Sequence, residues 1–214
     1  NKDYTSYTLT RNLKIRTCVY CNRSYTLTQT KYGKTGERDG GRLMNPQLDH
    51  YFPQSKYPLL QVSFFNLIPS CEICNSRVKN NFEFDLGIHT HPYQKEVPEF
   101  FFSYRKRYSP SNQDIQIFFI AQNEEGKKAK LTAEAMLTDR IYEAHQYELE
   151  DLIKLKKAYS SKYLDTLQAF FPGTNFDEVY RLIIGTEISP ENFHKRSFSK
   201  FNSDILNELR GKED

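Results

Sequence analysis

The sequence predicts an α+β protein in which a cysteine-rich unit is followed by a mainly helical C-terminal region. Two observations carry this prediction. Two Cys-x-x-Cys pairs, Cys18/Cys21 and Cys71/Cys74, bracket strand-like segments in the first part of the chain. In the later part, apolar residues recur at spacings of three and four, which is typical of amphipathic helices.

The length of 214 residues suits one large domain or a small domain with an appendage. We divide the chain into a core at residues 1–92, which holds all four cysteines, and a C-terminal region at residues 93–214. We expect the C-terminal region to pack on the core or to bind a partner protein.

The N-terminal segments point to a short helix and a flexible connection. Apolar and polar residues from Thr8 to Ile15 favour a helix that leads into the first cysteine pair. Residues 28–42 are rich in Gly, Lys and Thr, which favours a loop or a mobile hairpin.

Between the cysteine pairs the pattern is strand, loop, strand and helix. Gln47–Phe52 has strand character and is followed by Pro53. Phe64–Ile68 is expected to form a second strand that ends at Pro69, and a short helix should then extend through Lys79.

The C-terminal region adds one strand and then helices. The expected elements are a strand at residues 114–121, a turn at Glu124–Gly126, one long helix or two helices from Thr132 to before Pro172, a helix at residues 176–184 ended by Gly185, and a helix start at Ser189-Pro190.

Bulk composition excludes several classes of protein. With 38% hydrophobic and 27% charged residues, the chain has the composition of a soluble globular protein. No apolar run approaches the roughly 18 residues of a membrane span. We find no secretory signal and expect a cytoplasmic protein with no membrane partner. Because the chain begins with Asn1 and not Met, we expect Asn1 to be an internal position of a longer protein.

Charge is unevenly distributed along the chain. Residues 1–80 contain 12 Lys/Arg and 5 Asp/Glu, a net charge of +7, whereas residues 81–214 contain 18 and 22, a net charge of −4. A basic N-terminal part would attract phosphate backbones, and chance clustering is the alternative.

All four cysteines fall into the two close pairs. Without a secretory signal, a disulfide framework is not expected. Four thiolates in two Cys-x-x-Cys pairs are typical of a structural, tetrahedral zinc site. Because Cys21 and Cys71 are 50 positions apart, a folded element must lie between the pairs.

Four polar residues around these pairs have the chemistry of a phosphodiesterase site. His50 suits the role of general base, because the pKa of histidine is near neutrality. Asp49 and Asn75 offer the oxygen ligands that Mg²⁺ prefers. Consecutive strand residues point to opposite faces, so Asp49 and His50 share a site only where the strand bends or ends. Asn66 could bind backbone groups of the intervening loop and thereby orient His50. Each residue alone is more often structural, and only their order and spacing favour a catalytic site.

Three motifs in Cys18–Lys79 resemble the HNH endonuclease family in its zinc-containing ββα-metal form. Leu48–Pro53 matches the first motif, Phe65–Pro69 matches the central asparagine motif, and Cys71–Arg77 matches the third. The match covers about a third of the chain.

The resemblance implies a role for each of these residues. His50 would be the general base, Asp49 and Asn75 would bind a catalytic Mg²⁺ or Mn²⁺, and Asn66 would orient His50. The products would carry 5′-phosphate and 3′-hydroxyl ends. The expected substrate is nucleic acid, with DNA favoured over RNA.

The flanking segments resemble a bacterial group of HNH nucleases that accompany ATPases or other sensors in anti-phage defence, such as the Septu nuclease subunit and retron-associated HNH effectors. That resemblance implies an ATPase or another defence-system partner. Two alternatives stay open: an adaptor subunit that cleaves only in complex with its partner, and a zinc-containing nucleic-acid-binding module without catalysis.

Other polar residues near the motifs have two readings. Arg23, Lys56, Arg77 and Lys79 are candidates for phosphate binding, and a solvated surface is the alternative. His89 and His91 either approach the metal or, as we favour, pack and cap. We expect His145 and His194 to be structural.

Overall fold

The computed structural model is an α+β structure that contains three separate two-stranded antiparallel sheets among the residues it describes. The described residues are 5–32, 41–94, 99–109, 112–158, 166, 169–171, 173 and 176–211. No helix within these ranges is long and apolar enough to cross a membrane.

The N-terminal segment forms a capped helix and a small loop around the first cysteine pair. Helix α1 (Ser6–Leu13) begins two residues before the expected start, because Thr5 and Thr8 form a capping box. An isolated bridge between Thr17 and Tyr25 then closes the loop that carries Cys18 and Cys21.

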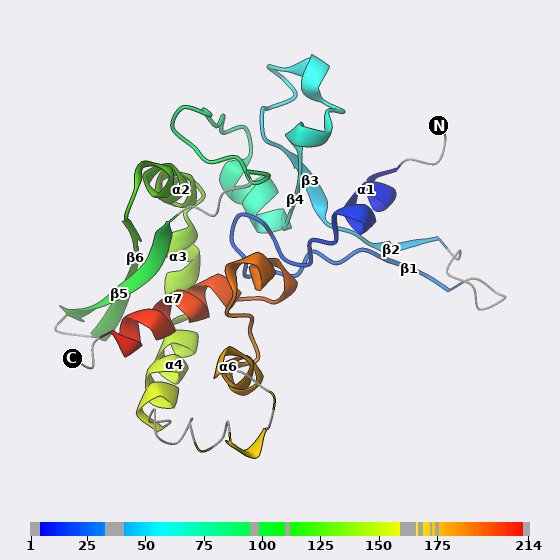
Figure 1. Ribbon diagram of the computed structural model, residues 1–214. Coiled ribbons are helices and arrows are strands. Elements are labelled where there is room, and N and C mark those ends of the chain that lie inside the picture. Colours follow the sequence, from blue (N-terminus) through cyan, green and yellow to red (C-terminus); the bar gives the residue numbers. More distant parts are fainter. Residues whose placement is uncertain are drawn as a thin grey trace.

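The segment expected to be a loop or hairpin is a hairpin at its described ends. Strand β1 (Gln29–Thr30) pairs with β2 (Arg42–Met44), and residues 33–40 lie outside the described residues. Figure 1 shows these strands extending away from the body of the molecule.

The hairpin that carries the candidate histidine is short. Strand β3 (Gln47–His50) pairs antiparallel with β4 (Leu67–Ser70), and His50 lies opposite Leu67 at the end of the ladder. The expected first strand extended to Phe52, but pairing stops at His50. His50 therefore lies where the strand gives way to a loop.

The expected second strand at residues 64–68 is wrong in its first half. Phe64–Asn66 forms a 3₁₀ turn, η2, and the strand begins only at Leu67. Pro69 lies inside β4 and does not end it. In a two-stranded sheet each strand has one open edge, and there the missing N–H of proline costs no ladder hydrogen bond.

The expected short helix after Cys71 is present but has an unusual winding. It is a π-helix, η3 (Ile73–Lys79), in which the Asn80 amide donates to the Asn75 carbonyl at 2.8 Å. Asn80, with a φ of 45°, ends the helix.

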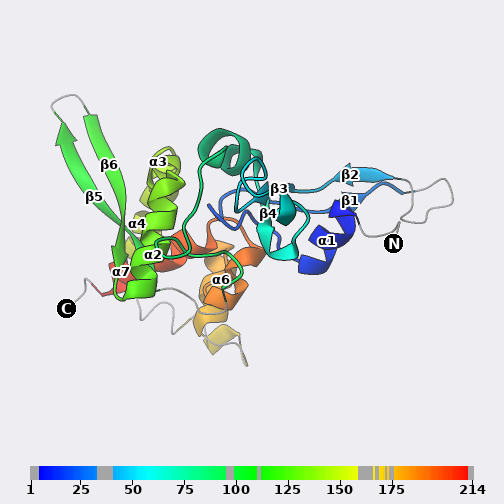
Figure 2. The ribbon, with the colours of Figure 1, turned by 90° about the horizontal axis from the view of Figure 1, so that it is seen from above.

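A long hairpin opens the C-terminal region, and only half of it was expected. Strand β5 (Phe100–Ser109) pairs along its full length with β6 (Asn112–Ala121), whereas the sequence predicts a strand only at residues 114–121. Phe102 is buried at the base of β5, but Arg105–Arg107 are exposed near its outer end. This change from core to solvent along one strand hides its periodicity. Figure 2 shows the hairpin at the opposite end of the molecule from β1 and β2.

The expected turn at Glu124–Gly126 is wrong, because these residues begin helix α2 (Glu124–Ala135). Asn123 caps the helix by accepting a hydrogen bond from the Gly126 amide at 2.7 Å. There is no space for a side chain at Gly126, because a Cβ there would lie 2.2 Å from the Glu99 carbonyl oxygen. The glycine marks a close approach of helix and chain.

Helical structure continues to the C-terminus in shorter pieces than expected. The remaining elements are α3 (Thr138–Glu143), α4 (Gln146–Ala158), α6 (Phe176–Ile184), the 3₁₀ helix η4 (Pro190–Lys195) and α7 (Ser199–Arg210). Between Thr132 and Ala158, all of which is described, the chain passes through three helices, so the expectation of one or two is wrong there. Leu137, with a φ of 49°, separates α2 from α3. The expected helix at residues 176–184, ended by Gly185, is confirmed.

Two apolar cores lie side by side, one in each half of the chain. The C-terminal core contains Phe102, Tyr142 and Phe201, and helix α7 packs along β5. The other core surrounds Cys18 and Cys74 and includes Met136 from the C-terminal region. The contacts therefore cross the expected division near residue 92.

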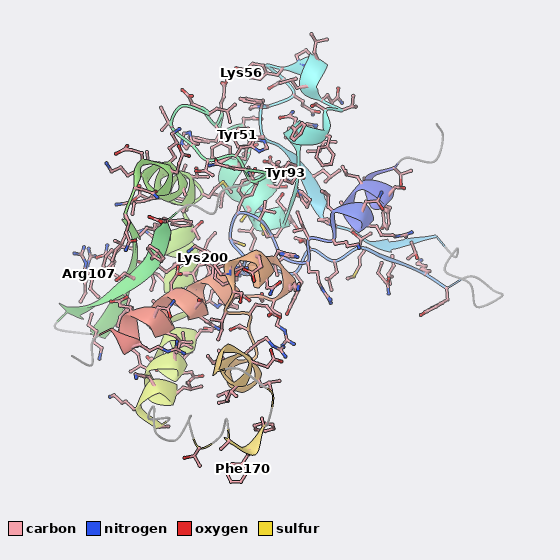
Figure 3. The ribbon with its side chains drawn as sticks, viewed as in Figure 1. Tyr51, Lys56, Tyr93, Arg107, Phe170 and Lys200 are labelled. Carbon is pink, nitrogen blue, oxygen red and sulfur yellow. The ribbon has the colours of Figure 1, made fainter. Side chains whose placement is uncertain are left out.

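Asn22, directly after the first cysteine pair, anchors the N-terminal loop on the C-terminal segment. Its side chain donates to the Phe193 carbonyl at 2.8 Å and accepts from the Lys200 amide at 3.1 Å. Its own carbonyl accepts from the Phe198 amide at 2.9 Å. The Lys200 side chain in turn reaches the Phe100 carbonyl at 2.7 Å, where α7 meets the base of β5 (Figure 3).

Replacement of Tyr142 tests the coupling between the two cores. Its hydroxyl donates to the Cys21 carbonyl at 2.7 Å in a fully buried position, so Tyr142→Phe should leave that carbonyl without its donor. We expect a loss of about 1–3 kcal/mol, or a fall in Tm of about 5 °C in a thermal melt. The exposed Tyr147→Phe is the matched control, and equal melting temperatures for the two variants would contradict the coupling.

Candidate metal centre and active site

The four cysteine thiols converge on one point. Their sulfur atoms lie within 4.8 Å of one another, and the four cysteines are free, with no disulfide between them. Cys18, Cys21 and Cys74 are buried, and Cys71 is partly exposed. The loop before Asn22 supplies one pair and the start of η3 supplies the other. Four convergent thiols fit a tetrahedral zinc ion.

Hydrogen bonds among the thiols shift their acidities in opposite directions. The bond with Cys18 lowers the pKa of Cys21 to about 7, and bonds with Cys18 and Cys21 hold the pKa of Cys71 well below its ordinary value. The same network raises the pKa of Cys18 and of Cys74. Four adjacent thiolates repel one another, so a bound cation is what would allow all four to be deprotonated together.

His50 is held by the loop that follows its strand. Its Nε2 lies 3.0 Å from the carbonyl oxygen of Gln61. A nitrogen that bonds a carbonyl must carry the proton, so Nδ1 is the basic nitrogen of the neutral ring. Within the described residues no hydrogen bond to Nδ1 is present, and His50 is partly exposed. The Nδ1 lone pair is thus left without a hydrogen-bond donor from the described residues.

Asn66 organises the loop that holds His50. Its Oδ1 accepts from the Phe52 amide at 2.7 Å, and its Nδ2 donates to the carbonyls of Phe52 and Leu60, both at 3.1 Å. These are the loop contacts that the sequence predicts for Asn66. Leu60 directly precedes Gln61, so Asn66 acts one residue away from the carbonyl that binds the His50 ring.

Asp49 points away from His50 and is already occupied. Its Oδ1 lies 3.1 Å from the Lys79 ammonium, and its Oδ2 accepts from the Tyr20 hydroxyl at 2.6 Å. Asp49 is 2% exposed. Burial and the neighbouring carboxylate raise the pKa of Tyr20 well above its ordinary value, so this phenol remains a donor. The carboxylate is therefore satisfied by protein groups on both oxygens.

Asn75, the second expected ligand, bonds a different residue. Its Nδ2 donates to Gln47 Oε1 at 2.9 Å, and Ser76 donates to the same oxygen at 3.0 Å. Asp49 and Asn75 thus have separate partners. Among the described residues, the four cysteines are the only group of three or more His, Cys, Asp or Glu side chains that could hold a metal. As arranged, the Asp49 carboxylate has both oxygens bound by protein groups and does not fit a Mg²⁺ or Mn²⁺ site, whereas the hydrogen bond of Asn75 leaves its own ligand atom, Oδ1, unused.

The four basic residues proposed for phosphate binding differ in their surroundings. The expected phosphate-binding role of Lys79 is wrong, because its side chain is fully buried against Asp49 and cannot reach a phosphate. Lys56 lies in the loop between β3 and β4, where it pairs with Glu83 at 2.6 Å (Figure 3). Arg23 lies 3.4 Å from the His145 ring, and Arg77 is exposed on η3.

His89 and His91 are packing and capping residues, as favoured from the sequence. His91 accepts from the Tyr93 amide at 3.1 Å and its Nε2 lies 2.9 Å from the Phe65 carbonyl. Both ring nitrogens are therefore used, and burial lowers the pKa of His91, which keeps it neutral. His89 accepts from the Asp85 amide at 3.1 Å.

Three contributors to the site were not identified from the sequence. Gln61 acts through its backbone carbonyl, which carries no side-chain signal. Tyr20 and Gln47 act through side chains, and Gln47 could have been found because it lies two residues before Asp49 on the same strand. No known protein family model, curated protein or solved structure matches the chain. Its functional assignment therefore depends on the residues described above.

The cysteine geometry predicts one tightly bound zinc ion per chain. Elemental analysis of the purified protein should find about one zinc ion, and strong chelation should lower Tm steeply because thiolate binding is coupled to folding. Intact mass under non-reducing conditions is the control, since each disulfide would remove about two hydrogen masses. A folded, metal-free chain with two disulfides would contradict the prediction.

Proposed function

We propose that this chain is a nuclease that hydrolyses phosphodiester bonds in nucleic acid, with His50 as the general base. The observation that carries the proposal is the His50 ring itself. Its Nε2 is tied to the Gln61 carbonyl at 3.0 Å, which leaves Nδ1 as a base of defined orientation.

The surrounding architecture supports an HNH-type core. A two-stranded hairpin, β3–β4, is followed directly by a helical segment, η3, and cysteine pairs lie before the hairpin and at the start of the helix. This is the order of elements that a zinc-containing ββα-metal unit requires. Asn66, in the loop between the strands, has the contacts expected of the central asparagine.

The proposed reaction begins with a water molecule placed near His50 Nδ1. His50 accepts a proton from this water as the water oxygen attacks phosphorus. The bond from phosphorus to the 3′ oxygen then breaks, and the leaving oxygen takes a proton from solvent. The products are a 5′-phosphate and a 3′-hydroxyl.

A catalytic Mg²⁺ or Mn²⁺ would neutralise charge at the phosphate when bound. Because both carboxylate oxygens of Asp49 are bound by Lys79 and Tyr20, we assign no step of the reaction to such an ion.

The substrate and context are proposed on two further grounds. The net charge of +7 in residues 1–80 favours a polyanionic substrate, for which we propose DNA. The resemblance of the flanking segments supports a role in anti-phage defence beside an ATPase or another sensor protein.

Replacement of His50 tests the proposed function. His50→Ala should reduce cleavage of plasmid DNA by at least about 100-fold, because removal of a general base costs about 10²–10⁴ in rate. His194→Asn, a histidine of η4, is the matched control. Assays on plasmid, single-stranded DNA and RNA would define the substrate. Equal cleavage by wild type and His50→Ala would refute the proposal, and retained DNA binding in that case would favour a binding module.

Replacement of Asn66 tests how the base is oriented. Asn66→Ala removes three hydrogen bonds to the loop and should lower kcat by about 10-fold while changing KM little, since orientation affects the chemical step. Leu59→Ala, which alters a fully exposed side chain in the same loop, is the control. Full activity of Asn66→Ala would show that the loop needs no such support.

A further inference from the structure

The buried cluster of Tyr20, Asp49 and Lys79 points to a role that the HNH resemblance does not assign. We infer that Asp49 is the counter-ion of Lys79 and not a metal ligand, and that Lys79 is a positioning residue for His50. The positioning role rests on the proposed function, whereas the counter-ion role stands on geometry alone.

The ion pair is enclosed by the protein. The Lys79 side chain is 0% exposed and that of Asp49 is 3% exposed, with 3.1 Å between ammonium and carboxylate. Tyr20 donates to the other carboxylate oxygen at 2.6 Å. In such surroundings each charge depends on the other, because an unpaired buried charge is strongly destabilising.

A divalent ion at Asp49 would break this arrangement. Mg²⁺ binds oxygen at about 2.1 Å and keeps several water molecules, for which the buried Asp49 carboxylate leaves no room. The ion would have to displace the ammonium of Lys79 or the hydroxyl of Tyr20. A displaced Lys79 would remain buried, without its counter-ion and beside a second cation.

Lys79 also reaches the backbone of the proposed base. Its ammonium donates to the His50 carbonyl at 2.7 Å, so one side chain bridges Asp49 and His50. On the other side of the residue, the Gln61 carbonyl bonds the His50 ring, and the Tyr51 amide donates to the Asn66 carbonyl at 3.0 Å. The strand end is thereby held by both η3 and the loop.

The counter-ion role is tested by thermal unfolding of Lys79→Met, Asp49→Asn and the double variant. Each single change should lower Tm by about 10 °C, and the double variant should recover at least half of that loss, because it removes both charges together. The exposed pair Lys56/Glu83 is the matched control. The effects of Lys56→Met and Glu83→Gln on Tm should be additive in their double variant. Additive losses at Asp49 and Lys79 would overturn the inference.

Binding of Mn²⁺, followed by electron paramagnetic resonance, separates the counter-ion from a ligand. Wild type and the double variant should show the same Kd within about two-fold, or neither should bind. A Kd for Mn²⁺ that is ten-fold or more higher in the double variant than in wild type would show that Asp49 is a ligand and would overturn the inference. This measurement needs no catalytic activity, so it remains decisive even where His50→Ala refutes the proposed function.

The positioning role has a spectroscopic readout. In wild type, nitrogen NMR of His50 should show the neutral ring protonated at Nε2, as the bond to Gln61 requires. The double variant should shift toward a mixture of tautomers, and kcat should fall by about 10-fold with KM unchanged. An unchanged tautomer together with unchanged kcat would refute the positioning role.

Discussion

The convergence of four cysteine thiols is the constraint on which the rest of the structure depends. Cys21 and Cys71 are 50 positions apart, yet the four sulfur atoms lie within 4.8 Å of one another. The hairpin between them has strands of only four residues, too short for stability in isolation. Closure at the cysteines brings η3 against this hairpin. The buried Lys79, the end of β3 and the partly exposed His50 all take their positions from that closure.

The parts of the site that could be predicted from the sequence are those with a local signature. Two cysteine pairs require their thiols to meet, and an asparagine beside a strand is well suited to bond loop carbonyls, as Asn66 does. The α+β class followed from similarly local patterns. Gly126 shows the limit of predictions from local sequence. In the sequence, a glycine that allows two backbone segments to approach closely cannot be distinguished from a glycine that allows a turn.

The features that could not be predicted depend on distant parts of the chain. Lys79 has the composition of a surface residue, and only the fold shows that Asp49 meets it inside the protein. Strand β5 was missed because its base lies in the core and its outer half lies in solvent. The breaks between α2, α3 and α4 follow from packing against β6 and α7, which helical periodicity does not record.

The anchoring of Asn22 has a consequence for the order of events during synthesis. This residue follows the first cysteine pair, yet its partners Phe193 and Lys200 lie 171 and 178 positions later in the chain. At about 5–20 residues per second, a ribosome needs roughly 10–35 s to make that stretch. The first cysteine loop therefore gains these two anchoring bonds only after Phe193 and Lys200 have been made.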